Sequence, residues 1–94
     1  MYTIKFTKEA EDTFDSITGQ LNERFSTKTV LKFQEELEKV LKNISISPLI
    51  FPIVDERTEV RKCVLHKQCS MFYRVYEEEI IVICFWDNRQ SSIW

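Results

Sequence analysis

Hydrophobic residues alternate with polar ones at the start of this chain, take a helical spacing through its middle, and cluster in short runs over its last third. Tyr2, Ile4 and Phe6 are separated by polar residues, and a period of two predicts a strand with one buried face. From Lys8 onward the spacing changes to threes and fours, which indicates a helix. The pattern therefore predicts a short first strand followed directly by a helical region.

Two helices are predicted in the middle of the chain. The first begins after Thr7, whose hydroxyl suits a helix N-cap, and ends near Gly19 or continues to Phe25. The second begins at Ser26 or Thr27. Two helices joined by so short a turn form an antiparallel hairpin, and their apolar stripes need a sheet to cover. The apolar stripe of the second helix consists of Val30, Phe33, Leu37, Val40 or Leu41, and Ile44.

Three short strands are predicted for the last third of the chain. The runs 61–65, 69–76 and 80–86 are rich in β-branched and aromatic residues and are separated by polar turns, which is typical of an antiparallel meander. Two prolines end the second helix and mark an irregular crossing over about residues 45–59. The more polar side of the middle strand is expected to face away from the helices, and it holds Ser70, Phe72, Arg74 and Tyr76.

The predicted order of elements is β-α-α-β-β-β. This is an α+β fold in which a helical hairpin packs on one face of a small antiparallel sheet. The 94 residues are enough for a single domain over 1–94 but not for a second core. No apolar run approaches the ~20 residues that span a bilayer, and no signal-peptide pattern opens the chain, so a cytoplasmic protein without a membrane partner is expected.

The balance of charge argues against a role in binding bulk nucleic acid. Thirteen basic and fifteen acidic side chains leave a net charge of −2, whereas non-specific affinity for phosphate needs an excess of Lys and Arg. Positive charge is nevertheless gathered along the predicted sheet, where guanidinium groups suit a phosphodiester or a row of carboxylates. Ordinary solvated surface charge is the alternative. The candidate binding residues are Arg61, Lys62, Lys67, Arg74 and Arg89.

Few residues offer other chemistry. Cys63, His66 and Cys69 have a spacing that resembles a zinc site, but a structural zinc needs four converging ligands and the fourth is missing. The three cysteines are expected to be buried, and no metal is expected. A single glycine rules out glycine-rich phosphate loops, so no cofactor is expected. Histidine is the side-chain type suited to proton transfer near neutral pH, and His66 is the only histidine in the chain.

The predicted order, together with two motifs, resembles the RelE/ParE superfamily of toxins over nearly the whole chain. The first motif is Phe6-Thr7 followed by Ala10, and the second is Asp87, Arg89 and Gln90 after a hydrophobic strand. The resemblance implies the toxin half of a type II toxin-antitoxin module. Such a protein inhibits growth, contributes to plasmid stabilisation in some settings, and is neutralised by an antitoxin encoded beside it.

The superfamily contains two activities. RelE-like members cut messenger RNA on the ribosome, and ParE-like members inhibit DNA gyrase. If this chain were an endoribonuclease, the resemblance and the residue types would assign catalysis to Arg61, His66, Tyr73 and Arg89. However, Cys63 and Ser70 stand where RelE-like toxins carry basic residues, and no tyrosine follows Tyr76. The ParE-like branch is therefore favoured.

Two further expectations concern partners. An antitoxin peptide, extended or helical, is expected on the helical hairpin and across the sheet, with acidic side chains meeting the arginines. The expected assembly is a homodimer or a heterotetramer with the antitoxin. Trp94 is a candidate contact for the target or the antitoxin. The remaining alternative is a non-toxic module that binds only an antitoxin or a second copy of itself.

Overall fold

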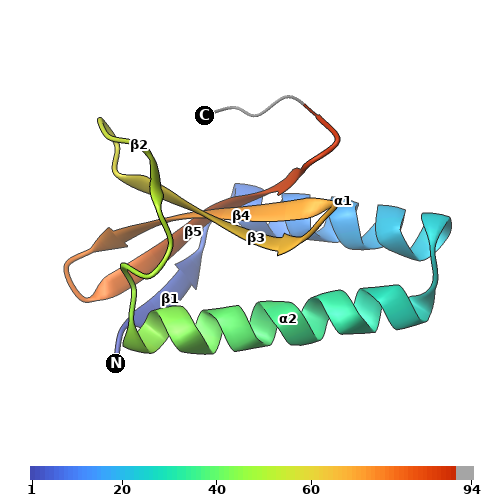
Figure 1. The fold of residues 1–94 in the computed structure, drawn as a ribbon, viewed down its shortest axis with the longest axis horizontal. Helices are drawn as coiled ribbons and strands as arrows, with labels where there is room; N and C mark the ends of the chain where they lie inside the picture. Colours follow the sequence, from blue (N-terminus) through green and yellow to red (C-terminus); the bar gives the residue numbers. More distant parts are fainter. Residues whose placement is uncertain (91–94) are drawn as a thin grey trace.

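A computed structural model describes residues 1–90, in which two helices pack against one mixed five-stranded sheet (Figure 1). The fold class predicted from the sequence is confirmed. In chain order the elements are β1 (Thr3–Phe6), α1 (Lys8–Arg24), α2 (Thr27–Ile46), β2 (Ile53–Asp55), β3 (Val60–His66), β4 (Cys69–Tyr76) and β5 (Glu79–Asp87).

The helices begin at the predicted caps. The Thr7 hydroxyl accepts a hydrogen bond from the backbone N–H of Ala10 at 3.0 Å, and the Ser26 hydroxyl accepts one from Thr29 at 3.2 Å. Each bond satisfies a backbone donor that has no partner within the helix. The first helix continues past Gly19 to Arg24, because buried Leu21 extends its apolar stripe by another turn.

The strands lie in the order β1-β5-β4-β3-β2. Tight turns join β3, β4 and β5, which makes these neighbours antiparallel. The first strand instead returns through the helical hairpin and pairs with β5 in parallel, so the sheet is mixed rather than wholly antiparallel. The expectation of an irregular crossing over 45–59 is wrong for Ile53–Asp55, which pair with the start of β3 as an edge strand.

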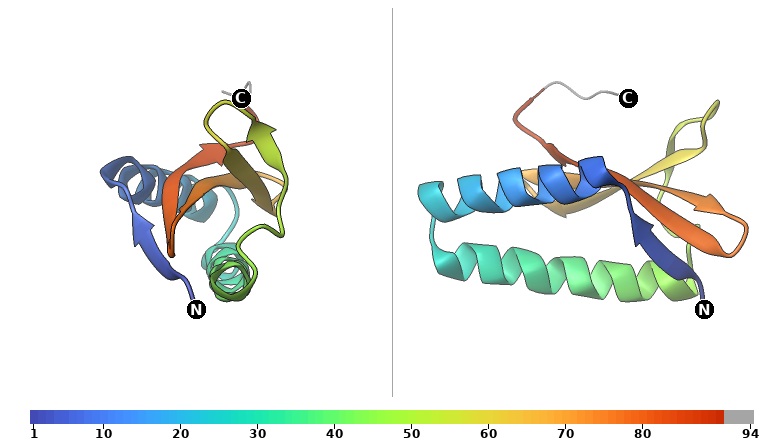
Figure 2. Two further views of the ribbon diagram at one scale, coloured as in Figure 1. Left: turned by 90° about the vertical axis from the view of Figure 1, so that its left-hand side faces the viewer. Right: turned by 180° about the vertical axis from the view of Figure 1, so that it is seen from behind.

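The main core lies between the helices and one face of the sheet. Helix α1 packs over β5, while α2 packs over β3 and beside β1. Seen from behind, the helices run antiparallel, and β1 begins beside the end of α2 and runs to the start of α1 (Figure 2). Buried residues from both layers meet there, among them Ile17, Leu21, Phe33, Ile44, Met71, Tyr73 and Phe85.

The opposite face of the sheet holds a smaller cluster. Phe72 packs there with Val60 and Cys84. The alternation predicted for the middle strand places Ser70, Phe72, Arg74 and Tyr76 on this side, but Ser70 and Phe72 are fully buried and only Arg74 and Tyr76 are exposed. The polar side of this strand is therefore open only toward its end.

Side chains of α1 continue the hydrogen bonding of β5 where β1 stops. The Thr7 hydroxyl donates to the carbonyl of Ile83 at 2.6 Å, and the Thr13 hydroxyl accepts from the N–H of Phe85 at 2.9 Å. Backbone groups at a sheet edge need such partners when they are removed from water. Helix α1 thus protects the edge of β5 beyond Val82, where β1 no longer pairs with it.

We expect Thr13→Val to lower the free energy of unfolding by about 1–3 kcal/mol, because the Phe85 N–H would lose its acceptor inside the protein. Thr13→Ser keeps the hydroxyl and should recover most of the loss. Urea denaturation followed by circular dichroism measures both values. Thr18→Val is the matched control, since the Thr18 hydroxyl bonds only within its own helix, to the carbonyl of Asp15. Equal losses for the two valine variants would contradict a sheet-capping role.

Candidate functional site

The predicted binding residues do not form one cluster. Arg61 is half-buried and holds the loop between α2 and β2. One nitrogen of its guanidinium donates to the carbonyls of Leu49 at 3.2 Å and Phe51 at 2.7 Å. Tyr73, directly opposite Arg61 in the sheet, is fully buried and donates to the carbonyl of Pro48 at 2.8 Å. Burial raises the pKa of the Tyr73 hydroxyl.

Lys62 and Arg74 lie on the face of the sheet away from the helices. The Lys62 ammonium sits 5.9 Å from the centre of the Phe72 ring, within the range of a cation–π contact. Arg74 is exposed further along β4. Neither residue shares a face with Arg61, because adjacent positions in a strand point to opposite sides.

A second group lies at the far end of the sheet, where β5 ends. Hydrogen bonds of Asn88 connect the β3–β4 turn to the end of β5. Its side-chain amide donates to the carbonyls of His66 and Lys67, both at 3.3 Å, and its amide oxygen accepts from the Ser70 hydroxyl at 2.7 Å. The backbone N–H of Asn88 adds a bond to the carbonyl of Gln68 at 2.9 Å. Asn88 therefore fixes the β3–β4 turn against the segment that carries Arg89.

Arg89 is held in one orientation by two side chains. Its Nε donates to a carboxylate oxygen of Asp87 at 2.9 Å, and a terminal nitrogen donates to Gln20 of α1 at 3.0 Å. The hydrogen bond from Arg89 lowers the pKa of the Asp87 carboxyl, and the charge of Arg24 acts in the same direction. The guanidinium groups of Arg24 and Arg89 therefore both act on the same carboxylate, that of Asp87.

We define the basic end as Arg24, Phe25, Lys67 and Arg89. Arg24, Phe25 and Arg89 border one shallow depression between the end of α1 and the end of β5, and Phe25 is 52% exposed. Lys67 and Arg89 were predicted from the sequence as binding residues, whereas Arg24 and Phe25 were not. The sequence places both residues at the turn between the two helices, which is an exposed position. Their proximity to Arg89, however, depends on the length and packing of α1.

The four residues considered for RNA cleavage do not surround a common point. Arg61 pairs with Tyr73, whereas His66 pairs with Cys69 and therefore lies at the other end of β4. Their partners Tyr73 and Cys69 are four residues apart in β4, which corresponds to about 13 Å along the strand. The imidazole Nδ1 of His66 accepts a bond from the Gln68 N–H at 3.1 Å, which orients the ring toward its own turn. Trp94 lies outside the described residues.

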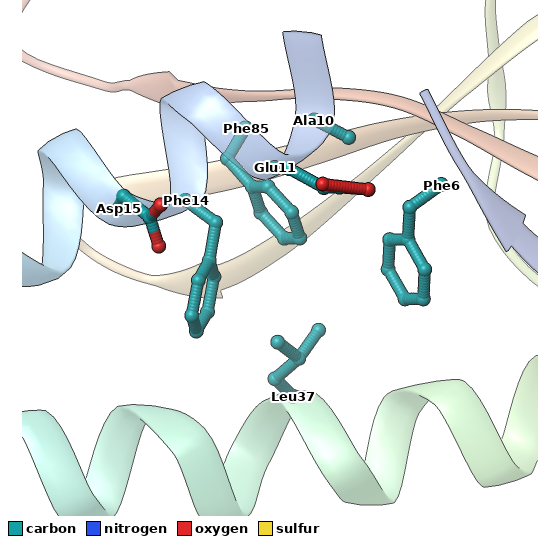
Figure 3. A pocket seen from close by; sticks show the side chains of 7 residues that line it. All are labelled: Phe6, Ala10, Glu11, Phe14, Asp15, Leu37 and Phe85. Carbon is teal, nitrogen blue, oxygen red and sulfur yellow. The ribbon is translucent and has the colours of Figure 1, made fainter. Parts of the chain in front are cut away.

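A groove of about 350 Å³ opens between the two helices and the end of β1 (Figure 3). Its apolar part comes from all three elements and from β5. Phe14 is in contact with Phe33 and with Phe85, at ring-centre distances of 6.0 and 5.4 Å. Two carboxylates of α1, Glu11 and Asp15, project beside the aromatic rings. The residues that line the groove are Phe6, Ala10, Glu11, Phe14, Asp15, Leu37 and Phe85.

The three cysteines are buried and unpaired with one another. Burial is the main cause that raises the pKa of Cys63 and of Cys84 to about 11 and that of Cys69 to about 12. Within residues 1–90 no group of three or more His, Cys, Asp or Glu side chains is placed to hold a metal ion. Over the same residues no helix is both long and apolar enough to cross a bilayer.

We expect all three thiols to resist a disulfide reagent at pH 8 in the folded protein. Only about one thiol in a thousand is ionised three pH units below its pKa, and the thiolate is the reactive form. Reaction with DTNB, followed by absorbance, should be slow until urea unfolds the chain, and then three equivalents should react. One fast equivalent in the folded protein would contradict the burial of that cysteine.

Comparison with known proteins identifies the family. The model of the ParE toxins of the type II toxin-antitoxin system parDE matches residues 4–91. No curated protein sequence matches this chain. Among solved structures, a chain of the chromosomal ParDE toxin-antitoxin system from P. aeruginosa superposes with a TM-score of 0.73 at 20% identity, covering 93% of this chain and 96% of that one.

A second similar structure is a copper-bound mutant toxin from Helicobacter pylori. Its TM-score is 0.68 at 17% identity, and the match covers 95% of this chain and 97% of that chain. At these identities the two structures establish a shared fold, while the family match rests on the sequence itself. Because that match extends over nearly the whole chain, the protein belongs to the ParE toxin family of type II toxin-antitoxin systems.

Proposed function

We propose that this protein inhibits bacterial growth by acting on DNA gyrase and that an antitoxin encoded beside it neutralises this activity. Membership of the ParE family carries the proposal. The proposed setting is the cytoplasm, where gyrase acts, and plasmid stabilisation is one role that such a module would fill.

The separation of Arg61 and Tyr73 from His66 and Arg89 supports gyrase inhibition over messenger RNA cleavage. A general acid or base must reach the reacting group within hydrogen-bond distance or through one water. The Tyr73 hydroxyl is buried and bonded to the Pro48 carbonyl, so it would have to leave the core before it could transfer a proton to RNA. Inhibition by binding alone needs no such set of groups.

We propose the basic end as the surface that contacts gyrase. Arginine and aromatic side chains are the residues most enriched among the strong contacts of protein interfaces, and Arg24, Phe25 and Arg89 border the same depression. Asp87 and Gln20 hold Arg89 in place, which reduces the entropy that a partner must remove on binding. Lys67 adds charge at the same end.

The antitoxin is the second proposed partner. One of the solved structures with this fold comes from a ParDE toxin-antitoxin system, and the groove between the helices offers apolar surface to a bound segment. Acidic residues of the antitoxin would meet Arg61, Arg74 or Arg89. The proposed assembly is a heterotetramer with the antitoxin, and a homodimer of this chain is the alternative.

The deciding experiment is to induce this chain alone in bacteria and to follow amino-acid incorporation and supercoiling of a reporter plasmid. We expect incorporation to continue for several minutes while supercoiling falls and the cells filament. Co-expression of the neighbouring gene should restore growth. An immediate stop in incorporation would contradict gyrase inhibition and indicate messenger RNA cleavage. Unaffected growth would contradict toxicity and indicate a binding module.

A further inference from the structure

Asn88 follows β5 directly, and its side chain bonds across the sheet to residues that lie 18 to 22 positions earlier in the chain. The amide nitrogen donates to the carbonyls of His66 and Lys67, and the amide oxygen accepts from the Ser70 hydroxyl. The backbone N–H of Asn88 adds a bond to the carbonyl of Gln68. One residue thus connects the segment after β5 to the whole β3–β4 turn.

The β3–β4 turn does not close by regular strand pairing. The register of the two strands shifts between Val64 and His66, and their last pair joins His66 to Cys69. Carbonyl groups in an irregular turn need donors from outside the ladder. Because the Asn88 amide donates to two of these carbonyls, the conformation of the turn depends on a residue from the far end of β5.

The buried Ser70 hydroxyl fixes the orientation of the Asn88 amide. Ser70 is 0% exposed, and its hydroxyl donates to the amide oxygen at 2.7 Å. A buried hydroxyl that loses its partner destabilises the fold, so this bond is kept in the native state. With its oxygen held toward Ser70, the amide directs its nitrogen at the turn carbonyls.

Two cations of the basic end lie on either side of this connection. Lys67 is exposed in the turn, and Arg89 follows Asn88 in the chain. The Arg89 side chain is held by Asp87 and Gln20, whereas the main chain that carries Lys67 is held by Asn88. Asn88 therefore sets where the backbone of Lys67 lies relative to that of Arg89.

We propose that Asn88 is a positioning residue of the basic end, which presents Lys67 and Arg89 to gyrase as one preorganised surface. The inference rests on the proposed function, because gyrase is the partner it concerns. Asn88 acts here through Lys67, without contact to the partner. A turn released from Asn88 would have to be ordered again on binding, and the lost entropy would lower the affinity.

The test compares Ser70→Ala with the double variant Ser70→Ala and Asn88→Ala in gyrase supercoiling assays. Ser70→Ala is the reference, because Asn88→Ala alone would leave a buried hydroxyl without its acceptor. None of these changes alters the charge of the protein. We expect the half-inhibiting concentration to rise about tenfold from the reference to the double variant. From the unchanged chain to the reference it should change by less than about twofold.

A second pair of variants repeats the comparison in a chain that carries Lys67→Ala. Arg24 and Arg89 remain in this chain, so inhibition stays measurable. Adding Asn88→Ala should now change the half-inhibiting concentration by less than about threefold, because the cation that Asn88 positions is gone and the two effects are not additive. An equal tenfold loss with and without Lys67 would mean a general loss of structure and would overturn the inference.

Hydrogen exchange followed by NMR tests the positioning step without gyrase. In the double variant the backbone amides of Gln68 and Asn88 should exchange about tenfold faster than in the Ser70→Ala reference, while that of Val82 in the middle of β5 keeps its rate. Unaltered exchange in the turn would overturn the inference and leave the proposed function standing. If the unchanged chain does not inhibit gyrase at all, the proposed function is overturned, and the role of Asn88 in inhibition with it.

Discussion

Replacing Arg24 and Arg89 together by alanine is expected to raise the concentration of this protein that half-inhibits gyrase supercoiling by about 10²- to 10³-fold. The two guanidinium groups lie at the same end of the molecule, one at the end of α1 and the other after β5. Truncating a strong interface contact typically costs 2 kcal/mol or more, and each 1.4 kcal/mol corresponds to about tenfold in affinity. Two such contacts account for the expected range.

The control for this prediction removes two exposed basic residues elsewhere. Lys42 lies near the end of α2, and Arg57 lies in the β2–β3 turn, at the side of the molecule opposite the helical hairpin turn (Figure 1). Lys42→Ala with Arg57→Ala makes the same change in net charge, so a loss of long-range electrostatic attraction would affect both variants equally. Similar inhibition by the two variants would contradict the assignment of the basic end as the gyrase-binding surface.

Phe33→Ala is expected to lower the free energy of unfolding by about 3–5 kcal/mol, because it leaves a cavity that the neighbouring layers close only in part. Phe33 is 1% exposed and stacks on Phe14, which in turn contacts Phe85 of the sheet. A domain of this size has a total stability of about 5–15 kcal/mol. The loss is therefore large enough to leave part of the chain unfolded at 37 °C, which thermal denaturation by circular dichroism will measure.

Phe25→Ala is the matched comparison on the same helical hairpin. Phe25 is 52% exposed, and removal of an exposed side chain usually changes stability by less than about 0.5 kcal/mol. We expect this variant to unfold like the unchanged chain but to inhibit gyrase less well, because Phe25 belongs to the basic end. Equal destabilisation by Phe25→Ala and Phe33→Ala would contradict the two-layer core described for the helices and the sheet.

The candidate site illustrates how little of a surface can be predicted from residue types. Alternation along a strand correctly placed Arg74 away from the helices. It could not show that the Arg61 guanidinium donates hydrogen bonds to two loop carbonyls, or that the buried Tyr73 hydroxyl donates one to the Pro48 carbonyl. Those contacts depend on the path of residues 47–52, and no periodic pattern encodes the path of a loop.

The local pattern of the sequence by itself determined both helices and four of the five strands of this protein. Periods of two and of three to four residues located the strands and helices, Thr7 and Ser26 marked the helix starts, and the order of elements fixed the fold class. These features depend on residues that are neighbours in the chain, so they can be read without knowledge of the tertiary structure.

Only the tertiary structure decided which distant residues meet. The parallel pairing of β1 with β5, the approach of Arg24 to Arg89, and the groove between Phe6, Phe14 and Leu37 each join segments that lie far apart in the sequence. Their positions follow from how two amphipathic helices of particular lengths pack on one twisted sheet. That packing is a collective property of the core, because each contact forms only when the others position it.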